Sequence, residues 1–403
     1  MSRAPVAELN LNPEDPGCFN RVDYFDVMAR LRDESPVHQY APGSWLVTRY
    51  DDVRAISRDP GRFCSGKGVL MNDPLRQGAE LPGSVLHMDP PDHAAWRSVA
   101  SRWFTPRSML VLEDRVREIS RQLLGDVDPH GPIDLVESLA APLPILVIAE
   151  LLGIDDGHHA DFRRWSDACI EGADSDGAEI DEMAALASVG ELLGFLGDQV
   201  TRRRNQLSDD LLSTLVASEV QGRPLGDDEI VMYAMSLLVA GNETTRHLIS
   251  GSAVALSDNP DQRKRWAADP SLSVAAVEEC LRWVTPIQAF ARTTTTDVEL
   301  SGQSVPAGDW LVMMYASANR DEAAFGPDAG HFDIGRAVSQ SHLAFGFGEH
   351  LCLGASLARL EARVFLDELL ARFPDYELVG EPTWTRSTLV RGVRTLPAVL
   401  TAT

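Results

Sequence analysis

The cysteine at position 352 lies in an unusual setting. Residues 344–354, AFGFGEHLCLG, contain three glycines, two phenylalanines and one histidine beside it. Glycines let a backbone turn tightly and approach a flat ligand. The helical pattern that follows puts Cys352 at a helix N-terminus, where free N–H groups stabilise a thiolate. A single thiolate without partners at zinc spacing suits an axial ligand to a macrocycle better than a zinc site.

The other four cysteines lack such a setting, so we interpret them as small buried hydrophobic residues: Cys18, Cys64, Cys169 and Cys280. All five are widely spaced, with no CxxC or CxxCH pattern. This spacing excludes a zinc ribbon and c-type haem attachment by those motifs. It also favours a reducing compartment, and we expect the cytoplasm.

An acid and a hydroxyl form a second group that could do chemistry. Glu243 and Thr244 lie in LVAGNETTR, within an apolar-rich segment without proline from Asp227 to about Leu256. A carboxyl and a hydroxyl linked to water could supply protons in a dry pocket. The alternative for Glu243 is an ion pair with Arg246 or His247, three or four residues on.

The composition limits the partners and the fold. A formal net charge of −24 argues against nucleic acid and against an anionic membrane surface. The N-terminus shows no signal peptide, and the longest apolar run, 139–154, is interrupted by two prolines and a glutamate, so we expect no membrane anchor. The length of 403 residues allows one large domain or two.

Most segments have helical periodicity, and few read as strands. Residues 111–125 show one apolar stripe, and 208–218 begins at Ser208, a possible N-cap. Residues 44–48 read as a strand, and 297–315 as two strands around a Pro-Ala-Gly turn. The fold class is therefore mainly α with a small β portion.

Four motifs in order carry a family resemblance. FGFGEHLCLG (345–354) resembles the haem-binding loop of the cytochrome P450 family, and LVAGNETTR (238–246) resembles its oxygen-activation segment. EECLRW (278–283) and FDIGR (332–336) are similar to its ExxR pair and the loop that this pair anchors. The resemblance implies one triangular-prism-like domain over 1–403, with a β-rich part at roughly 36–63, 285–330 and 376–403.

The resemblance also implies roles for residues. Cys352 would ligate the iron of haem b, within a loop shaped by Phe345, Gly348 and Gly354. Ala240 and Gly241 would face the haem, and Glu243 and Thr244 would deliver protons. Glu279 and Arg282 would support the loop structurally. The two propionates would be neutralised by a basic set: His93, Arg97, Arg292 and His350.

The implied reaction is monooxygenation, with O₂ as oxidant and insertion of one oxygen atom into a C–H bond. No flavin or ferredoxin module is visible, so electrons would come from a ferredoxin and a ferredoxin reductase. Candidates for a basic docking patch are Arg102, Arg107, Arg359 and Arg363, although these arginines could equally pair with neighbouring acids. A peroxide-driven enzyme and a non-catalytic haem sensor or carrier are the alternatives.

The substrate is expected to be an apolar small molecule. The motifs GNETTR, LRW and SANRDEAAF are similar to those of actinobacterial P450s that hydroxylate sterols, branched lipids or terpenoids, with macrolide or polyketide tailoring as the alternative. The acidic segment 170–182 reads as a mobile lid or a solvated loop. Pocket candidates are residues 65–88 and 170–184 with Met235, Val239, Ile287, Ala289, Phe290, Leu389 and Val390.

Overall fold

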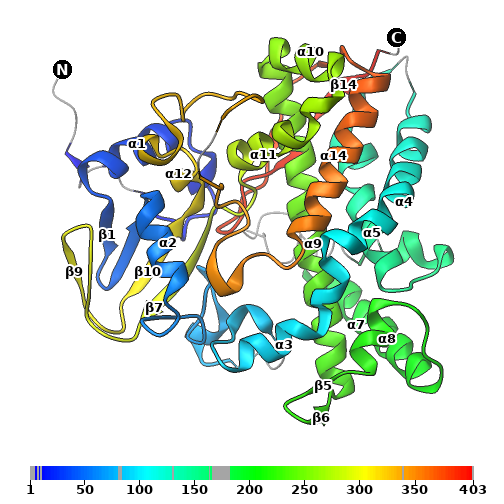
Figure 1. Cartoon of the computed structure of the whole chain (residues 1–403), viewed down its shortest axis with the longest axis horizontal. Helices are drawn as coiled ribbons and strands as arrows, with labels where there is room; N and C mark the ends of the chain where they lie inside the picture. The colour runs from blue at the N-terminus through cyan, green and yellow to red at the C-terminus, as the bar shows by residue number, and fades with distance from the viewer. Residues whose placement is uncertain are drawn as a thin grey trace.

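Helices dominate the chain in the computed structural model, as the sequence predicted (Figure 1). The structure describes residues 5–401 except 7, 8, 10, 80–83, 129–130, 163, 166–181 and 338–339. Its α-helices are α1 (Tyr24–Glu34), α2 (Tyr50–Arg58), α3 (Asp92–Ser101), α4 (Pro106–Gly125), α5 (Pro142–Leu151), α7 (Glu182–Asn205), α8 (Leu211–Val216), α9 (Asp227–Asp258), α10 (Pro260–Ala268), α11 (Ser273–Val284), α12 (Tyr315–Ala318), α13 (Glu322–Phe325) and α14 (Ala355–Arg372).

Shorter helical turns connect these helices. They are the π-helical turn η6 (Val136–Ala140) and the 3-10 turns η2 (Cys18–Asn20), η3 (Pro74–Gln77), η4 (Val85–His87), η5 (Arg102–Phe104), η7 (Asp156–His158), η8 (Pro270–Leu272) and η9 (Gly348–His350). In the part of the chain that the structure describes, no helix has the length and apolar character needed to cross a bilayer.

The long helix α9 organises the helical part of the molecule. The segment was predicted to be helical through about Leu256, and it runs from Asp227 to Asp258. Its first turn is fixed by Glu229, whose carboxylate accepts the N–H of Gly226 at 2.9 Å, and Pro260 starts the next helix. Helices α5, α7, α11 and α14 all pack on α9, which explains apolar residues on more than one face.

A five-stranded sheet forms the other part, on the left of Figure 1. Its order is β1 (Val37–Ala41), β2 (Ser44–Val47), β10 (Trp310–Met314), β7 (Ala289–Thr294) and β3 (Phe63–Cys64). Only the β10–β2 pair among these neighbours is parallel, with Trp310 opposite Ser44. Helices α1, α2 and α12 lie beside this sheet, which holds two smaller apolar clusters apart from the large helical core.

Residues 297–315 form three strands. Two of them, β9 (Gln303–Val305) and β10, flank the Pro-Ala-Gly turn as predicted, and the prediction missed β8 (Val298–Leu300). β8 and β9 form a hairpin across Ser301 and Gly302, which both have positive φ. Two residues with positive φ make the tight turn that a two-residue hairpin needs.

Short strand pairs complete the β portion: β5 (Glu219–Val220) with β6 (Arg223–Pro224), β12 (Thr383–Trp384) with β13 (Val393–Thr395), and β11 (Glu377–Leu378) with β14 (Pro397–Val399) and β4 (Ile133–Asp134).

The predicted helix at 111–125 is the C-terminal part of α4, but the start of the 208–218 helix differs from the prediction. Asp210, not Ser208, is the N-cap of α8, because its side chain accepts the N–H of Ser213 at 2.6 Å. Either residue type can cap a helix, and the two positions are too close for sequence to choose between them.

Candidate active site

The loop before α14 holds Cys352 in a tight turn. The N–H of Cys352 donates to the carbonyl of Phe345 at 2.9 Å. Gly346 and Gly348 have φ of +70° and +73°, values that strain any other residue. A Cβ on Gly348 would collide with the carbonyl oxygen of Ser57 in α2. The glycines are therefore required by the turn and by its contact with the sheet side of the molecule.

The thiol of Cys352 is surrounded by protein yet keeps accessible surface. Burial raises the pKa of the Cys352 thiol, and three groups oppose this: the N–H of Gly354 and the charges of Arg97 and Arg359. Arg97 also donates a hydrogen bond to the carbonyl of Leu351, which fixes the loop against α3. The donors around the sulfur would stabilise it as a thiolate ligand.

Basic side chains from three elements meet beside this loop. His93 of α3 and His350 of η9 have ring centroids 4.1 Å apart. His93 is buried, and its Nε2 has no hydrogen-bond partner among the described residues. Arg292 of β7 is also buried, and its Nη1 donates only to the carbonyl of Ala291, at 2.7 Å, among the described residues. Arg97 lies near enough to affect both histidines.

The electrostatics of this basic cluster favour an anionic ligand. Burial, together with the charges of Arg292, His93 and Arg97, lowers the pKa of His350 to about 3. Burial also lowers the pKa of His93, as do both arginines, whereas the Asp89 carboxylate opposes that shift. Buried positive charge of this kind is stabilised by paired carboxylates. The cluster and the unpartnered His93 nitrogen therefore fit a ligand with two carboxylates.

The middle of α9 forms an accessible wall. Ala240 is exposed and Gly241 half-buried, and the polypeptide leaves open space where a Cβ on Gly241 would lie. The Thr244 hydroxyl donates to the Ala240 carbonyl at 2.8 Å. Glu243 lies 3.3 Å from His247, the contact that the alternative interpretation foresaw. Burial lowers the pKa of His247, so the contact is a hydrogen bond that the neutral ring donates to a Glu243 carboxylate oxygen.

Glu279 and Arg282 form a buried, two-pronged ion pair on α11. The Nε and Nη2 atoms of Arg282 each lie 2.7 Å from one carboxylate oxygen of Glu279. Arg282 also donates to the carbonyls of Asn319, Ala329 and His331, while Glu279 accepts the N–H of Asp333. The pair therefore holds the segment that contains FDIGR, through backbone groups.

Comparison with known proteins gives the family. The sequence model of the family "Cytochrome P450" matches residues 271–383. The methyl-branched lipid omega-hydroxylase of Mycobacterium tuberculosis is 38% identical over 98% of this chain and 95% of its own. The chain belongs to the cytochrome P450 family.

Other relatives of this P450 act on different molecules. The vitamin D(3) 25-hydroxylase of Pseudonocardia autotrophica is 41% identical over 92% of each chain. The mycinamicin IV hydroxylase/epoxidase of Micromonospora griseorubida is 39% identical over 94% of this chain and 97% of its own. The open structure of the P450 EryK from S. erythraea superposes with a TM-score of 0.85, at 36% identity, and covers 95% of this chain and 97% of its own.

This P450 is a haem-dependent monooxygenase, with haem b as cofactor and O₂ as oxidant. Haem ligated by a cysteine thiolate, as is known for the family, supplies the cleavage of the O–O bond. The residues described above fit that group, because Cys352 is an exposed residue and the basic cluster contacts its loop through Arg97 and His350. Ala240 and Gly241 leave accessible surface on α9. We predict that Cys352 ligates the iron, while His93, Arg97, Arg292 and His350 hold the propionates.

The pocket candidates lie in different environments. Met235 and Val239 of α9 and Phe290 of β7 are partly exposed. Ile287 pairs with Val390 in an isolated bridge, and Gln288 donates its N–H to the Leu389 carbonyl at 2.9 Å, so these two segments are neighbours. Ala289 is fully buried in a sheet cluster. Residues 80–83 and most of 170–182, like Cys169, lie outside the described residues; Cys18, Cys64 and Cys280 are buried.

Sequence reasoning missed the hydrogen bonds that two acidic residues, Asp89 and Glu361, make near this site. Asp89 accepts the N–H groups of Ser65 and Gly66 at 2.7 and 2.9 Å, and the Ser65 hydroxyl lies 3.2 Å from His350. Glu361 of α14 is buried, and its carboxyl hydrogen-bonds Thr245 of α9. An acid on the apolar stripe of a helix was the one sequence signal for Glu361. No sequence pattern indicated the contacts of Asp89.

Proposed function

We propose that this P450 hydroxylates an apolar small molecule of the sterol, terpenoid or methyl-branched lipid class. One observation carries the proposal. Three of the pocket candidates, Met235, Val239 and Phe290, are apolar, uncharged and partly exposed. The relatives named for a methyl-branched lipid and for vitamin D(3), which cover more than nine-tenths of the chain, support it.

Macrolide tailoring is the second candidate. The similarity to the mycinamicin hydroxylase and to EryK supports it. These relatives have nearly the same identity to the chain as the lipid and vitamin D hydroxylases, so similarity alone does not choose between the classes. The choice depends on the side chains that line the pocket.

A spectral titration of the purified ferric protein tests the substrate class. The panel is a sterol, a terpenoid, a methyl-branched fatty acid and a macrolide, each followed through the Soret band. A ligand that fills the pocket displaces water from the iron and shifts this band. We expect a saturable shift with one of the first three. A shift with the macrolide alone would contradict the proposal and support tailoring.

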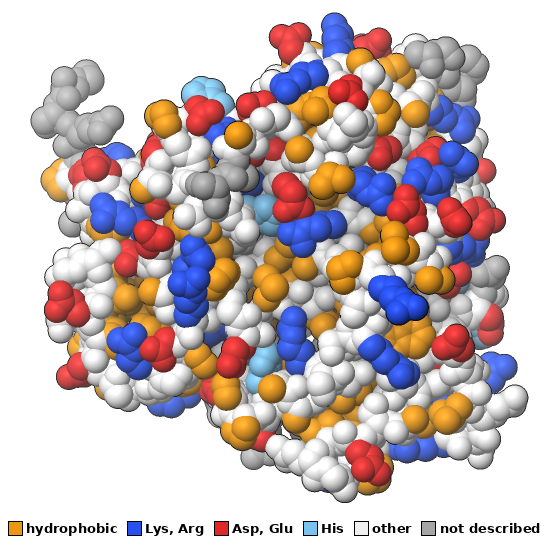
Figure 2. Space-filling model, viewed as in Figure 1, with side chains coloured by type: hydrophobic (Ala, Val, Ile, Leu, Met, Phe, Trp, Pro, Cys, Tyr) orange, Lys and Arg blue, Asp and Glu red, His pale blue; other side chains and the backbone are white. Residues whose placement is uncertain are grey.

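We also propose that a separate ferredoxin, reduced by its own reductase in the cytoplasm, supplies the electrons by docking on the face over Cys352. Basic, acidic and apolar side chains are mixed on the face that Figure 2 shows. Leu351, next to the cysteine, is 45% exposed, and Leu110 and Val111 of α4 are 73% and 84% exposed. Exposed apolar side chains together with basic ones suit contact with an acidic electron carrier.

The four arginines of the predicted patch differ in their partners. Arg359 forms a two-pronged contact with Glu278, and Arg363 lies 2.7 Å from Glu113, as the ion-pair alternative foresaw. Arg102 is exposed and donates to the hydroxyl of Thr214. Arg107 is exposed. Arg102 and Arg107 are therefore the better candidates for contact with a partner.

Charge reversal tests the docking face. We expect Arg102→Glu with Arg107→Glu to lower the rate of ferredoxin-supported turnover by about tenfold at low salt, with a smaller loss at high salt. Arg372→Glu, at the exposed far end of α14, is the matched control. Equal rates for the two variants would contradict the proposed face.

A further inference from the structure

His247 of α9 is a fully buried histidine one helical turn after Glu243. The exposed fractions of the two side chains are 0% for His247 and 12% for Glu243. The Nε2 atom of His247 lies 3.3 Å from Oε1 of Glu243, and its Nδ1 atom has no hydrogen-bond partner among the described residues. Burying a polar ring costs free energy unless the ring is hydrogen-bonded. The contact with Glu243 therefore accounts for a histidine at this position.

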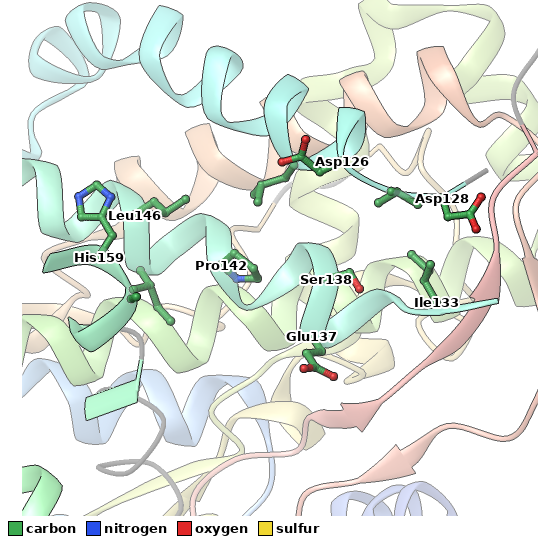
Figure 3. A pocket seen from close by; sticks show the side chains of 12 residues that line it. Asp126, Asp128, Ile133, Glu137, Ser138, Pro142, Leu146 and His159 are labelled. Atoms are coloured by element: carbon green, nitrogen blue, oxygen red, sulfur yellow. The ribbon is translucent and has the colours of Figure 1, made fainter. Parts of the chain in front are cut away.

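The C-terminal segment holds the His247 ring in place. The ring lies so close to Gly392 that a Cβ on this glycine would collide with it. Gly392 directly precedes β13, and its carbonyl accepts the N–H of Thr385, the residue after β12, at 2.9 Å. Neither His247 nor Glu243 lines the cavity of about 440 Å³ that Figure 3 shows, so the ring has no empty space of that kind to turn into. Packing therefore keeps its Nε2 directed at Glu243.

The contact holds Glu243 without a full positive charge. Burial lowers the pKa of His247 although its hydrogen bond with Glu243 opposes the shift, and the charge of Arg246, also on α9, lowers it too. Gly392 and Val393, which pack on the ring, present backbone atoms to it. A cation at this place would disfavour protonation of the carboxylate, whereas a neutral N–H stabilises the anion less. Glu243 can thus be fixed and still take up and release a proton.

We propose that His247 is a positioning residue for proton delivery, whose neutral ring donates from Nε2 to Glu243 and holds that carboxyl within reach of Thr244 through water. The proposal rests on the proton-delivering role predicted above for Glu243 and Thr244. The Thr244 hydroxyl gives its one hydrogen to the Ala240 carbonyl, so a further proton must reach it from a donor. A general acid acts within hydrogen-bond reach or through one water, and a fixed carboxyl meets this condition better than one that samples several rotamers.

NMR of the haem-loaded enzyme, labelled with ¹⁵N-histidine, tests the contact itself. The ferrous carbonyl form is diamagnetic, and the ring signals lost in His247→Gln identify His247. We expect a neutral ring with its hydrogen on Nε2 from about pH 6 to about pH 8. A hydrogen on Nδ1 alone would overturn the proposal, because Nε2 could then donate nothing to Glu243. So would a ring that titrates at the ordinary pKa of about 6.5.

Two variants of His247 test the role in proton delivery. His247→Phe keeps a ring against Gly392 but removes the donor, and His247→Gln keeps an N–H donor. The substrate is the member of the ligand panel above that gives the largest Soret shift. We expect the ratio of O₂-driven to peroxide-driven turnover to fall about tenfold in His247→Phe, with a larger solvent isotope effect in D₂O, and to recover in His247→Gln. His38→Phe, the same change in a half-buried histidine of β1, is the control.

Glu243→Gln separates this proposal from the role on which it rests. If Glu243→Gln lowers the turnover ratio while His247→Phe matches the wild type, His247 is not a positioning residue and Glu243 keeps its role. If both variants match the wild type, the proton-delivering role of Glu243 fails as well. Equal losses in His247→Phe and His247→Gln, with an unchanged isotope effect, would also contradict the proposal, because the histidine would then serve only to pack α9 against Gly392.

Discussion

Replacing Glu279 by glutamine should destabilise the protein strongly, and the structure gives the size of the effect. The side chains of Glu279 and Arg282 are 3% and 2% exposed. Glu279 accepts two of the hydrogen bonds of Arg282 and lies 3.3 Å from Arg336. The variant leaves the buried Arg282 guanidinium without its carboxylate, whereas Arg336 keeps Asp328 at 2.9 Å. Breaking a buried pair in this way costs about 3–5 kcal/mol.

The neighbouring Glu278 provides a matched control. It pairs with Arg359 at 2.6 Å and lies 3.2 Å from the buried side chain of His342, but the Glu278 and Arg359 side chains are 39% and 40% exposed. An exposed pair contributes only about 0–1 kcal/mol, because water screens the charges. Glu278→Gln therefore makes the same chemical change one residue away, and its expected loss is smaller than that of Glu279→Gln.

Urea unfolding followed by tryptophan fluorescence gives the free energy of unfolding of each variant, and absorbance gives the haem retained per chain. We expect the midpoint of Glu279→Gln to fall well below that of Glu278→Gln, with an unchanged slope. The haem content should fall as well, because the pair holds the segment before the cysteine loop. Losses of equal size in the two variants would refute the argument from burial.

Three further changes test the site. Burial raises the pKa of Glu361 to about 8 from 4.5, so the stability of the wild type should decline as pH rises between these values, and Glu361→Gln should abolish this decline in urea midpoints. Gly348→Ala should destabilise by at least about 2 kcal/mol because of positive φ and collision with α2, whereas Gly330→Ala, which has open space, should change little; similar midpoints would contradict this. Thr244→Ala should lower O₂-driven turnover about 100-fold but spare peroxide-driven turnover, and Thr244→Ser should restore it; an unchanged O₂ rate would favour the peroxide-driven alternative.

The sequence predicted the parts of the molecule that local patterns determine. The length of α9 followed from its apolar composition and its lack of proline, and the cysteine loop followed from its glycines. The buried Glu279–Arg282 pair was visible as an i, i+3 spacing, although its burial was not. Where two local signals competed, as at Ser208 and Asp210, sequence could not choose.

Contacts between distant segments were beyond sequence reasoning. Asp89 reaches back to the backbone of Ser65 and Gly66, and that arrangement depends on how the whole segment folds. Arg359 and Arg363 meet Glu278 and Glu113, which lie 81 and 250 residues away along the chain. For such residues the sequence left a docking role and an ion pair equally open, and only the packing of α14 on its neighbours distinguishes them.

The parallel pairing of β2 with β10 has a consequence for synthesis. Residues 44–47 reach their partner only when residues 310–313 have left the ribosome. At about 5–20 residues per second, this delay is on the order of tens of seconds. The edge of β2 that pairs with β10 therefore stays unpaired while the helices form. An unpaired edge of that kind pairs readily with other chains. Slower translation of the middle of the gene should thus increase the demand for chaperones.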